Sequence, residues 1–143
     1  MYSVYILRSE KYSYIGMTND FFRRWKQHNR ILKGGAKYTS KHDYWSPVCI
    51  IDGFKTMSEA MQCEWKLKRV KGVRNRVLNL VKILENDEKW TKNSPLIQNQ
   101  KLNVYTTEEY KSLLTLLTNI DFKKKNTILK KYENENYEIN ELI

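Results

Sequence analysis

Residues 2–29, YSVYILRSEKYSYIGMTNDFFRRWKQHN, combine two strand-like segments with a basic helical segment. Residues 2–8 and 12–18 are rich in aromatic and β-branched side chains, and three polar residues separate them. Two such segments joined by a short polar turn are typical of a β-hairpin. Alternation along the second segment places Tyr14 and Gly16 on the same face of the hairpin.

The segment after the hairpin predicts a helix. Thr18 or Asn19 can cap it, and Asp20 supplies an acidic residue to its first turn. We expect this helix to run to about Leu32, because the glycines beginning at Gly34 end it.

The later elements complete a small domain. Residues 48–54 predict a third strand, Ser58 can cap a second helix that ends near Gly72, and residues 74–85 predict a third helix. The order β-β-α-β-α-α predicts an α+β fold, with a small three-stranded mixed or antiparallel sheet flanked by helices.

The amino-acid composition of the chain changes after Asn86. We expect residues 1–85 to form one domain and residues 86–143 a helical C-terminal extension. Residues 107–119 predict a helix whose leucines pack on the domain, on a second copy of the chain, or on a partner. The last segment is either a helix docked through Ile128 and Leu129 or a frayed end.

The positive charge is unevenly distributed. Residues 1–85 hold 17 Lys and Arg against 7 Asp and Glu, whereas residues 86–143 hold 9 of each. A basic surface on one unit favours a polyanionic partner, because binding phosphates releases condensed counterions. The alternative is an inert basic surface of a lysine-rich chain.

Several classes of protein are disfavoured by composition. No apolar run approaches the roughly 20 residues that span a bilayer, and the N-terminus lacks the layout of a signal peptide. Cys49 and Cys63 are the two cysteines, so a disulfide framework and an all-cysteine zinc site are both disfavoured. We expect a soluble, intracellular protein without membrane contact, in the nucleus or the cytoplasm.

Polar side chains with catalytic chemistry lie on the first two helices. Arg24 and His28 are four residues apart and share a helix face; the ordinary alternative is that both are solvated. Glu64 interrupts an apolar stripe that includes Met57 and Met61. A buried carboxylate needs a cation, which can be an arginine or a divalent metal. A phenol acts as a base near neutrality only where cations lower its pKa.

The ordered motifs resemble the GIY-YIG nuclease family. Val4-Tyr5-Ile6 stands in place of the first motif, Tyr14-Ile15-Gly16 reproduces the second, and Arg24 follows Tyr14 at the spacing of the family arginine. Glu64 lies where the family glutamate is expected.

Within the family, residues 1–97 are most similar to the catalytic subunits of Slx-type structure-specific endonucleases. The shared motifs are YIG-M-T, RR-x-x-QHN, GGA-x-x-T, an E-W pair and a W-x-x-x-x-PL pattern. Such subunits normally end in a cysteine-rich RING, whereas this chain has no cysteine after Cys63. Dependence on a scaffold partner is therefore not implied.

The resemblance implies metal-dependent hydrolysis of DNA, in repair or recombination. Glu64 would bind one Mg²⁺ or Mn²⁺, Tyr5 would act as the general base or orient water beside Tyr14, Arg24 would hold the phosphate, and His28 would shuttle a proton or hold a phosphate oxygen. The residues that we expect to contact the DNA backbone are Arg23, Lys37, Tyr38, Thr39, Lys41, Lys68 and Arg69.

The substrate is expected to be branched, flapped or junction DNA, recognised by shape, because no base-reading module is evident. Two alternatives remain open. One is a non-catalytic nucleic-acid-binding or scaffold-interaction protein that keeps the fold, and the other is a mobile-element or restriction-type nuclease. A homodimer or a protein partner is expected to use residues 107–143.

Overall fold

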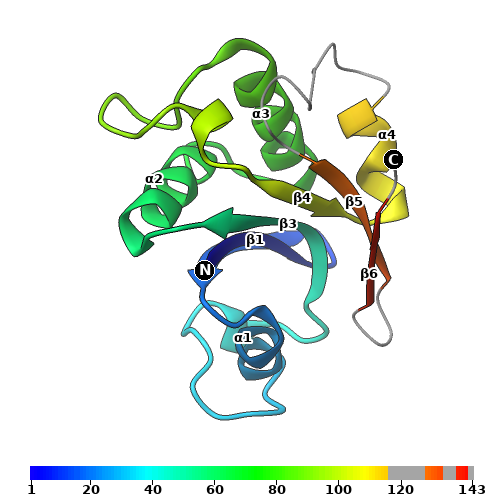
Figure 1. Ribbon diagram of the computed structural model, residues 1–143. Coiled ribbons are helices and arrows are strands. Elements are labelled where there is room, and N and C mark those ends of the chain that lie inside the picture. Colours follow the sequence, from blue (N-terminus) through cyan, green and yellow to red (C-terminus); the bar gives the residue numbers. More distant parts are fainter. Residues whose placement is uncertain (116–127, 134–137, 142–143) are drawn as a thin grey trace.

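The computed structural model describes residues 1–115, 128–133 and 138–141 of the chain, with side chains described through residue 114. Its strands form one sheet in the order β2-β1-β3-β4-β5-β6, antiparallel except for the parallel pair β4–β5 (Figure 1). The strands are β1 (Tyr2–Ser9), β2 (Tyr12–Thr18), β3 (Ser46–Phe54), β4 (Asn103–Thr106), β5 (Ile128–Glu133) and β6 (Glu138–Glu141).

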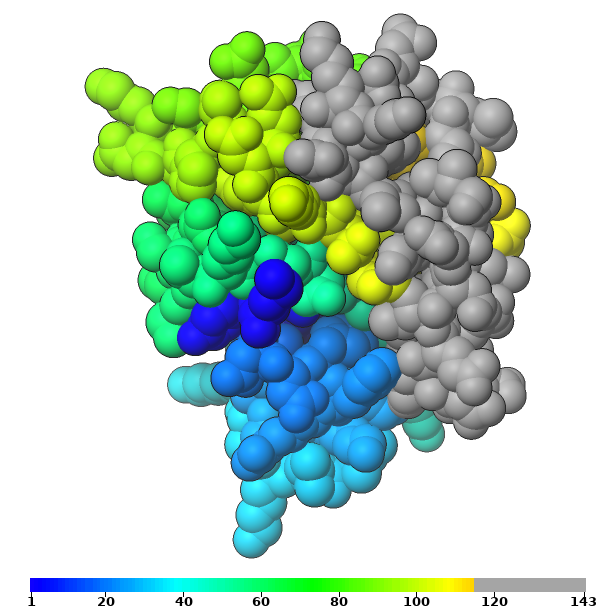
Figure 2. All heavy atoms as spheres, in the orientation of Figure 1, coloured from blue at the N-terminus to red at the C-terminus, as the bar shows by residue number. Residues whose placement is uncertain are grey.

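Helices cover both faces of this sheet. Helix α1 and the loop that follows it lie on one face, while α2 and α3 lie on the other (Figure 1). The space-filling view shows α1 and its loop as a lobe below the N-terminal strand (Figure 2). The helices are α1 (Phe21–His28), α2 (Met57–Leu67), α3 (Val73–Asn86) and α4 (Glu108–Thr115), with short 3₁₀ turns η1 (Thr39–Lys41) and η2 (Ile97–Asn99).

Alternation along β1 divides the core between the two faces. Val4 and Ile6 pack into the larger core beneath α2 and α3. Tyr5 and Leu7 point the other way and pack with Phe21 and other aromatic side chains on the α1 face. This alternation places the Tyr5 phenol beside α1.

The α+β fold class is confirmed, and the three predicted strands form the antiparallel set β2-β1-β3. A C-terminal extension built only of helix was wrong, because β4, β5 and β6 continue the sheet. Ile128 and Leu129 lie in β5, which pairs with β4. Strand pairing depends on an edge supplied by distant residues, here the edge of β3, and local patterning cannot reveal it.

The predicted helix at 107–119 is confirmed where the structure describes it, as α4. Leu113 and Leu114 are buried in the larger core, so this stripe packs within the chain. Residues 116–119, including Leu116 and Leu117, lie outside the described residues.

Several helix boundaries differ from the expectation. The N-cap of α1 is Asp20 rather than Thr18 or Asn19, and α2 ends at Leu67 rather than near Gly72. Helix α1 ends at His28 rather than Leu32, because the Asn29 side chain bonds both the N–H and the carbonyl of Trp45, and Arg30 takes a left-handed conformation. Helix α2 begins with Thr56 as its cap, in a capping box with Glu59. The early end of α1 releases the loop that contacts His28.

Among the residues that the structure describes, no helix combines the length and apolar character needed to cross a membrane.

Candidate active site

Tyr5 lies over a glycine in the outermost strand. In the β1–β2 register Tyr5 is opposite Gly16. A Cβ atom on Gly16 would stand 2.7 Å from Tyr5 Cζ, closer than real side chains approach. The missing side chain at Gly16 therefore makes room for the phenol at the β2 edge of the sheet.

The Tyr5 hydroxyl meets His28, which is buried at the end of α1. Tyr5 Oη lies 2.7 Å from His28 Nε2, and His28 Nδ1 lies 2.8 Å from Thr39 Oγ1. His28 is 1% exposed and Thr39 is fully buried. Both ring nitrogens are thus hydrogen-bonded to hydroxyl groups.

The direction of these hydrogen bonds follows from a third contact. Thr39 Oγ1 also lies 3.0 Å from the carbonyl oxygen of Ala36, which can only accept, so the threonine proton is donated there. Thr39 must then accept from a protonated His28 Nδ1. His28 Nε2 is left without a proton, and the Tyr5 hydroxyl donates to it.

Electrostatics support a neutral histidine. Burial, and then the positive charge of Arg24, lower the pKa of His28 to about 4. At neutral pH the ring therefore keeps one proton, which the Thr39 contact places on Nδ1.

Tyr5 is also neutral. Burial first, and then the neighbouring Tyr14, raise its pKa above the ordinary value of 10. Arg24 lowers the pKa of Tyr5, as the sequence led us to expect, but this effect is outweighed. Tyr5 therefore acts here as a hydrogen-bonded phenol, not as a ready phenolate base.

Arg24 is fixed between α1 and the loop after it. Its Nη1 donates to Gln27 Oε1 at 3.0 Å and to the Gly34 carbonyl at 2.7 Å. Its charge acts on the pKa values of both Tyr5 and His28. The role of Gln27 was missed, although its place three residues along the same helix was a usable signal.

Glu64 pairs with a lysine, where an arginine or a metal had been considered. Its Oε1 lies 2.8 Å from Lys68 Nζ, one helical turn along α2, and its side chain is 21% exposed. Met57 and Met61 are exposed, so the apolar stripe assigned around Glu64 was wrong. The face of α2 that packs on the sheet carries Ala60, Cys63 and Leu67.

The surroundings of Glu64 fit a single hard cation. No group of three or more His, Cys, Asp or Glu that could hold a metal occurs among residues 1–115 and the other described positions. Mg²⁺ commonly keeps several waters and is held by one or two carboxylates together with substrate phosphates. One partly exposed carboxylate, at Glu64, is compatible with that chemistry.

The expected DNA-contacting residues divide into two groups. Exposed side chains are found at Arg23, Lys37, Tyr38, Lys41, Lys68 and Arg69. The Arg69 guanidinium lies over the Trp65 ring, with Cζ 4.2 Å from the ring centroid. The expectation that Thr39 contacts DNA was wrong. Thr39 has no exposed surface, and its hydroxyl is hydrogen-bonded to His28 and Ala36, so it cannot contact DNA directly.

Comparison with known proteins points to one family. Residues 1–76 match the family model described as the GIY-YIG catalytic domain. Over 72 residues the chain is 46% identical to the structure-specific endonuclease subunit slx1 of Neurospora crassa, covering 47% of this chain and 18% of that protein. It is 44% identical to the subunit of the same name from Schizosaccharomyces japonicus, over 45% of this chain and 25% of the relative.

The similarity extends to a distant organism. A Giardia intestinalis protein named as a structure-specific endonuclease subunit SLX1 homolog is 44% identical over 57 residues, which cover 40% of this chain and 16% of that protein. The aligned part of this chain thus spans a quarter or less of the length of these relatives.

Proposed function

The chain belongs to the GIY-YIG family, and on this basis we propose that it is a metal-dependent endonuclease that hydrolyses phosphodiester bonds in DNA. The observation that carries the proposal is the hydrogen bond from the Tyr5 hydroxyl to a neutral, buried His28, with Arg24 and Glu64 within electrostatic reach of Tyr5. A phenol, a proton acceptor, a fixed guanidinium and a carboxylate suit hydrolysis of a phosphate diester.

In this proposal Glu64 holds one divalent ion, Mg²⁺ or Mn²⁺. Such an ion would polarise the scissile phosphate and stabilise the leaving oxygen. Lys68 must then give up its contact with Glu64 and would bind a phosphate oxygen instead. Arg24, held by Gln27 and Gly34, is already fixed to stabilise charge on the phosphate.

Tyr5 and His28 form the proton path. Tyr5 orients the attacking water and takes its proton while donating its own hydroxyl proton to His28 Nε2. Thr39 keeps Nε2 unprotonated and therefore able to accept. Tyr14, whose ring centroid lies 4.8 Å from that of His28, forms the wall beside this path.

We further propose a preference for branched, flapped or junction DNA, in repair or recombination. The names of the relatives describe structure-specific endonuclease subunits, which supports this preference and favours a protein partner. A homodimer or a partner surface within residues 107–143 stays a prediction, as does a boundary between units at residue 85. The alternatives are binding without cleavage and sequence-selective cleavage by a mobile-element or restriction-type nuclease.

One assay separates these possibilities. Labelled duplex, flap, splayed-arm and four-way-junction DNA are incubated with the full chain in Mg²⁺ and in EDTA. Cleavage of the branched substrates in Mg²⁺ alone supports the proposal. Binding without cleavage supports the non-catalytic alternative, and cleavage of plain duplex at defined sequences supports the restriction-type alternative.

Replacing Arg24 should slow cleavage far more than it weakens binding. Arg24→Ala is expected to lower kcat by about a hundredfold or more, the usual cost of losing one preorganised transition-state donor. Lys26→Ala removes the same charge from an exposed position on the same helix and serves as the control. Single-turnover rates and anisotropy titrations measure the two effects, and a loss confined to affinity would make Arg24 an ordinary surface cation.

Replacing Thr39 should impair the proton path without touching DNA. Thr39→Val leaves the Nδ1 proton of His28 without its acceptor and is expected to lower kcat by about tenfold or more while KM stays near its original value. Thr39→Ser keeps the hydroxyl and should restore the rate. Thermal melting of both variants reports the structural cost of an unpaired buried group, about 1–3 kcal/mol. Equal rates in the two variants would contradict the role of the hydroxyl.

A further inference from the structure

A groove runs along the β2 edge of the sheet, beside the candidate active site. It has a volume of about 530 Å³ and lies between the β1–β2 turn, the loop around Tyr38 and the connection from α2 to α3. We call it the β2-edge groove. Tyr14 and Lys68 both line it, so one end adjoins Tyr5 and Glu64.

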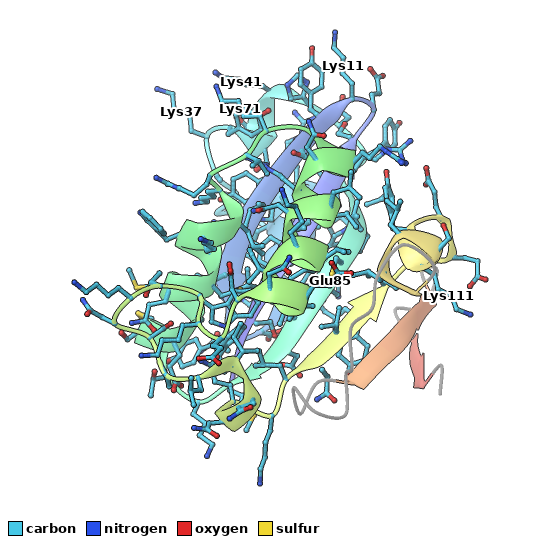
Figure 3. The ribbon with its side chains drawn as sticks, turned by 90° about the horizontal axis from the view of Figure 1, so that it is seen from above. Lys11, Lys37, Lys41, Lys71, Glu85 and Lys111 are labelled. Carbon is cyan, nitrogen blue, oxygen red and sulfur yellow. The ribbon has the colours of Figure 1, made fainter. Side chains whose placement is uncertain are left out.

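The cations in this groove come from separate parts of the chain. Besides Lys68, they are Lys11 in the β1–β2 turn, Lys71 after α2, and Arg76 on α3. Within the residues that the structure describes, none of Lys11, Lys71 and Arg76 has a carboxylate within 4.0 Å. Figure 3 shows Lys11 and Lys71 at one end of the molecule, together with Lys37 and Lys41.

Arg76 is the most informative of these cations. It is partly buried, and its guanidinium donates to the Ser13 hydroxyl at 2.8 Å and to the Val70 carbonyl at 3.0 Å. Both partners are neutral, so they orient the charge without balancing it. Burial lowers the pKa of Arg76, because the charged guanidinium is less stable where it is partly removed from water. A positioned cation without a counterion favours an anionic ligand.

A second groove on the molecule differs, because its cation is paired with a carboxylate of the protein. It has a volume of about 620 Å³ and is lined by Arg8, Trp25 and Tyr110 among others. There the guanidinium of Arg8 donates to Glu109 at 2.9 Å and to the Tyr110 hydroxyl at 2.6 Å. Its charge is balanced within the protein, so that groove has no comparable demand for an anion.

Aromatic rings line the same β2-edge groove. Tyr38 is 40% exposed, and its ring lies nearly parallel to that of Tyr14, with centroids 6.1 Å apart. The Tyr12 ring stacks on the His42 ring, with the two ring centroids 3.8 Å apart. Grooves that bind unpaired nucleic acid combine a basic track for the backbone with aromatic faces on which bases stack.

The size of the groove distinguishes an unpaired strand from a duplex. Its volume lies within the range of pockets that enclose a single small ligand, roughly 300–1,000 Å³, which suits nucleotide-sized units. A rigid duplex would lie across the mouth of such a groove, whereas a flexible strand can place a base and a phosphate inside it.

We propose that the β2-edge groove binds an unpaired arm of the DNA substrate, with phosphates at Lys11, Lys71 and Arg76 and a base stacked on Tyr38. The proposal rests on the proposed nuclease function and deepens it, since it names the part of a branched substrate that this chain holds. A strand in the groove reaches Tyr14 and Lys68, and therefore leads to the candidate catalytic residues.

The test uses the full chain and labelled DNA in EDTA, so that binding is measured without cleavage. Fluorescence anisotropy compares a flap substrate with a blunt duplex of the same double-stranded length. Lys11→Glu combined with Lys71→Glu is expected to weaken flap binding by at least about tenfold and duplex binding by about threefold or less. Lys92→Glu combined with Lys111→Glu makes the same change in net charge outside the groove, and Figure 3 shows Lys111 away from Lys11 and Lys71.

Stacking is tested separately from charge. Tyr38→Phe keeps the aromatic face and should bind the flap as the original chain does, whereas Tyr38→Ser should lose about fivefold or more of the flap affinity. Flap and duplex binding that fall equally in the Lys11 and Lys71 variant, or an equal loss in the control pair, would overturn the proposal. So would flap binding that none of these changes affects.

The result is separable from the proposed function. Cleavage of the flap is measured in parallel in Mg²⁺. Selective flap binding that depends on the groove, without cleavage, would support the groove and refute the nuclease. Cleavage that is indifferent to the groove variants would support the nuclease and refute the groove.

Discussion

Glu64→Gln is expected to abolish cleavage while leaving the fold and DNA binding intact. An amide is a poor ligand for Mg²⁺, and the loss of a metal that stabilises transition-state charge by several kcal/mol corresponds to roughly a thousandfold or more in rate. The structural cost should be small. Glu64 pairs with Lys68 across one turn of α2, and partly exposed pairs of this kind contribute about 0–1 kcal/mol.

The measurement is single-turnover cleavage of flap DNA over a range of Mg²⁺ and Mn²⁺ concentrations, with anisotropy and thermal melting as controls. Glu88→Gln makes the same chemical change at an exposed position beyond α3 and should behave as the original chain does. Full activity of Glu64→Gln, or activity that persists in EDTA, would remove the metal role from Glu64.

The hairpin and the residues that it carries could be predicted because their signals are local. Alternation over residues 2–18 gives both strands, and it puts Tyr5 on one face of β1 and Gly16 opposite it. The spacing of Arg24 and His28 on one helix is also local. Local patterns in the printed sequence therefore point to Tyr5, Tyr14, Arg24 and His28. Glu64 is different, because the apolar stripe that singled it out includes two methionines that are exposed.

The remaining features depend on contacts between distant residues. In the sequence Thr39 is an ordinary loop residue. It contacts His28 only because α1 ends early and the loop after it folds over that side chain. The apolar stripe of α2 was misassigned because Met57 and Met61 are hydrophobic yet face solvent. The net pKa of Tyr5 depends on burial, which outweighs the nearby Arg24 and has no signature in a short stretch of sequence.

Truncation after Asn86 should leave every proposed catalytic residue in the chain and yet unfold it. Among the described residues, seven side chains of the larger core lie beyond this point, and each is 8% exposed or less: Trp90, Ile97, Leu102, Val104, Tyr110, Leu113 and Leu114. Burying each contributes about 1.5–3 kcal/mol. Because a whole domain is stable by only about 5–15 kcal/mol, the fragment has too little stability to tolerate this loss.

The truncation also uncovers a strand edge. Residues of β3 from Cys49 to Asp52 pair with β4, and the fragment would expose their unpaired backbone next to apolar side chains. We therefore expect the 1–86 fragment to have low solubility and to aggregate. A 1–115 fragment keeps β4 and α4 and is expected to stay folded, which makes it the matched control.

The two fragments decide what the region after residue 86 does. Far-UV circular dichroism, size-exclusion chromatography and flap cleavage are measured for both. Residues 1–76 alone match the family's catalytic domain, which would suggest that 1–86 suffices. The shared core predicts otherwise, because β4 extends the sheet beside β3 and α4 adds buried leucines to the core layer that packs on the sheet. A soluble, monomeric and fully active 1–86 fragment would show that this layer is dispensable and that the region serves an external partner. Increased activity would instead identify the region as an inhibitory cover.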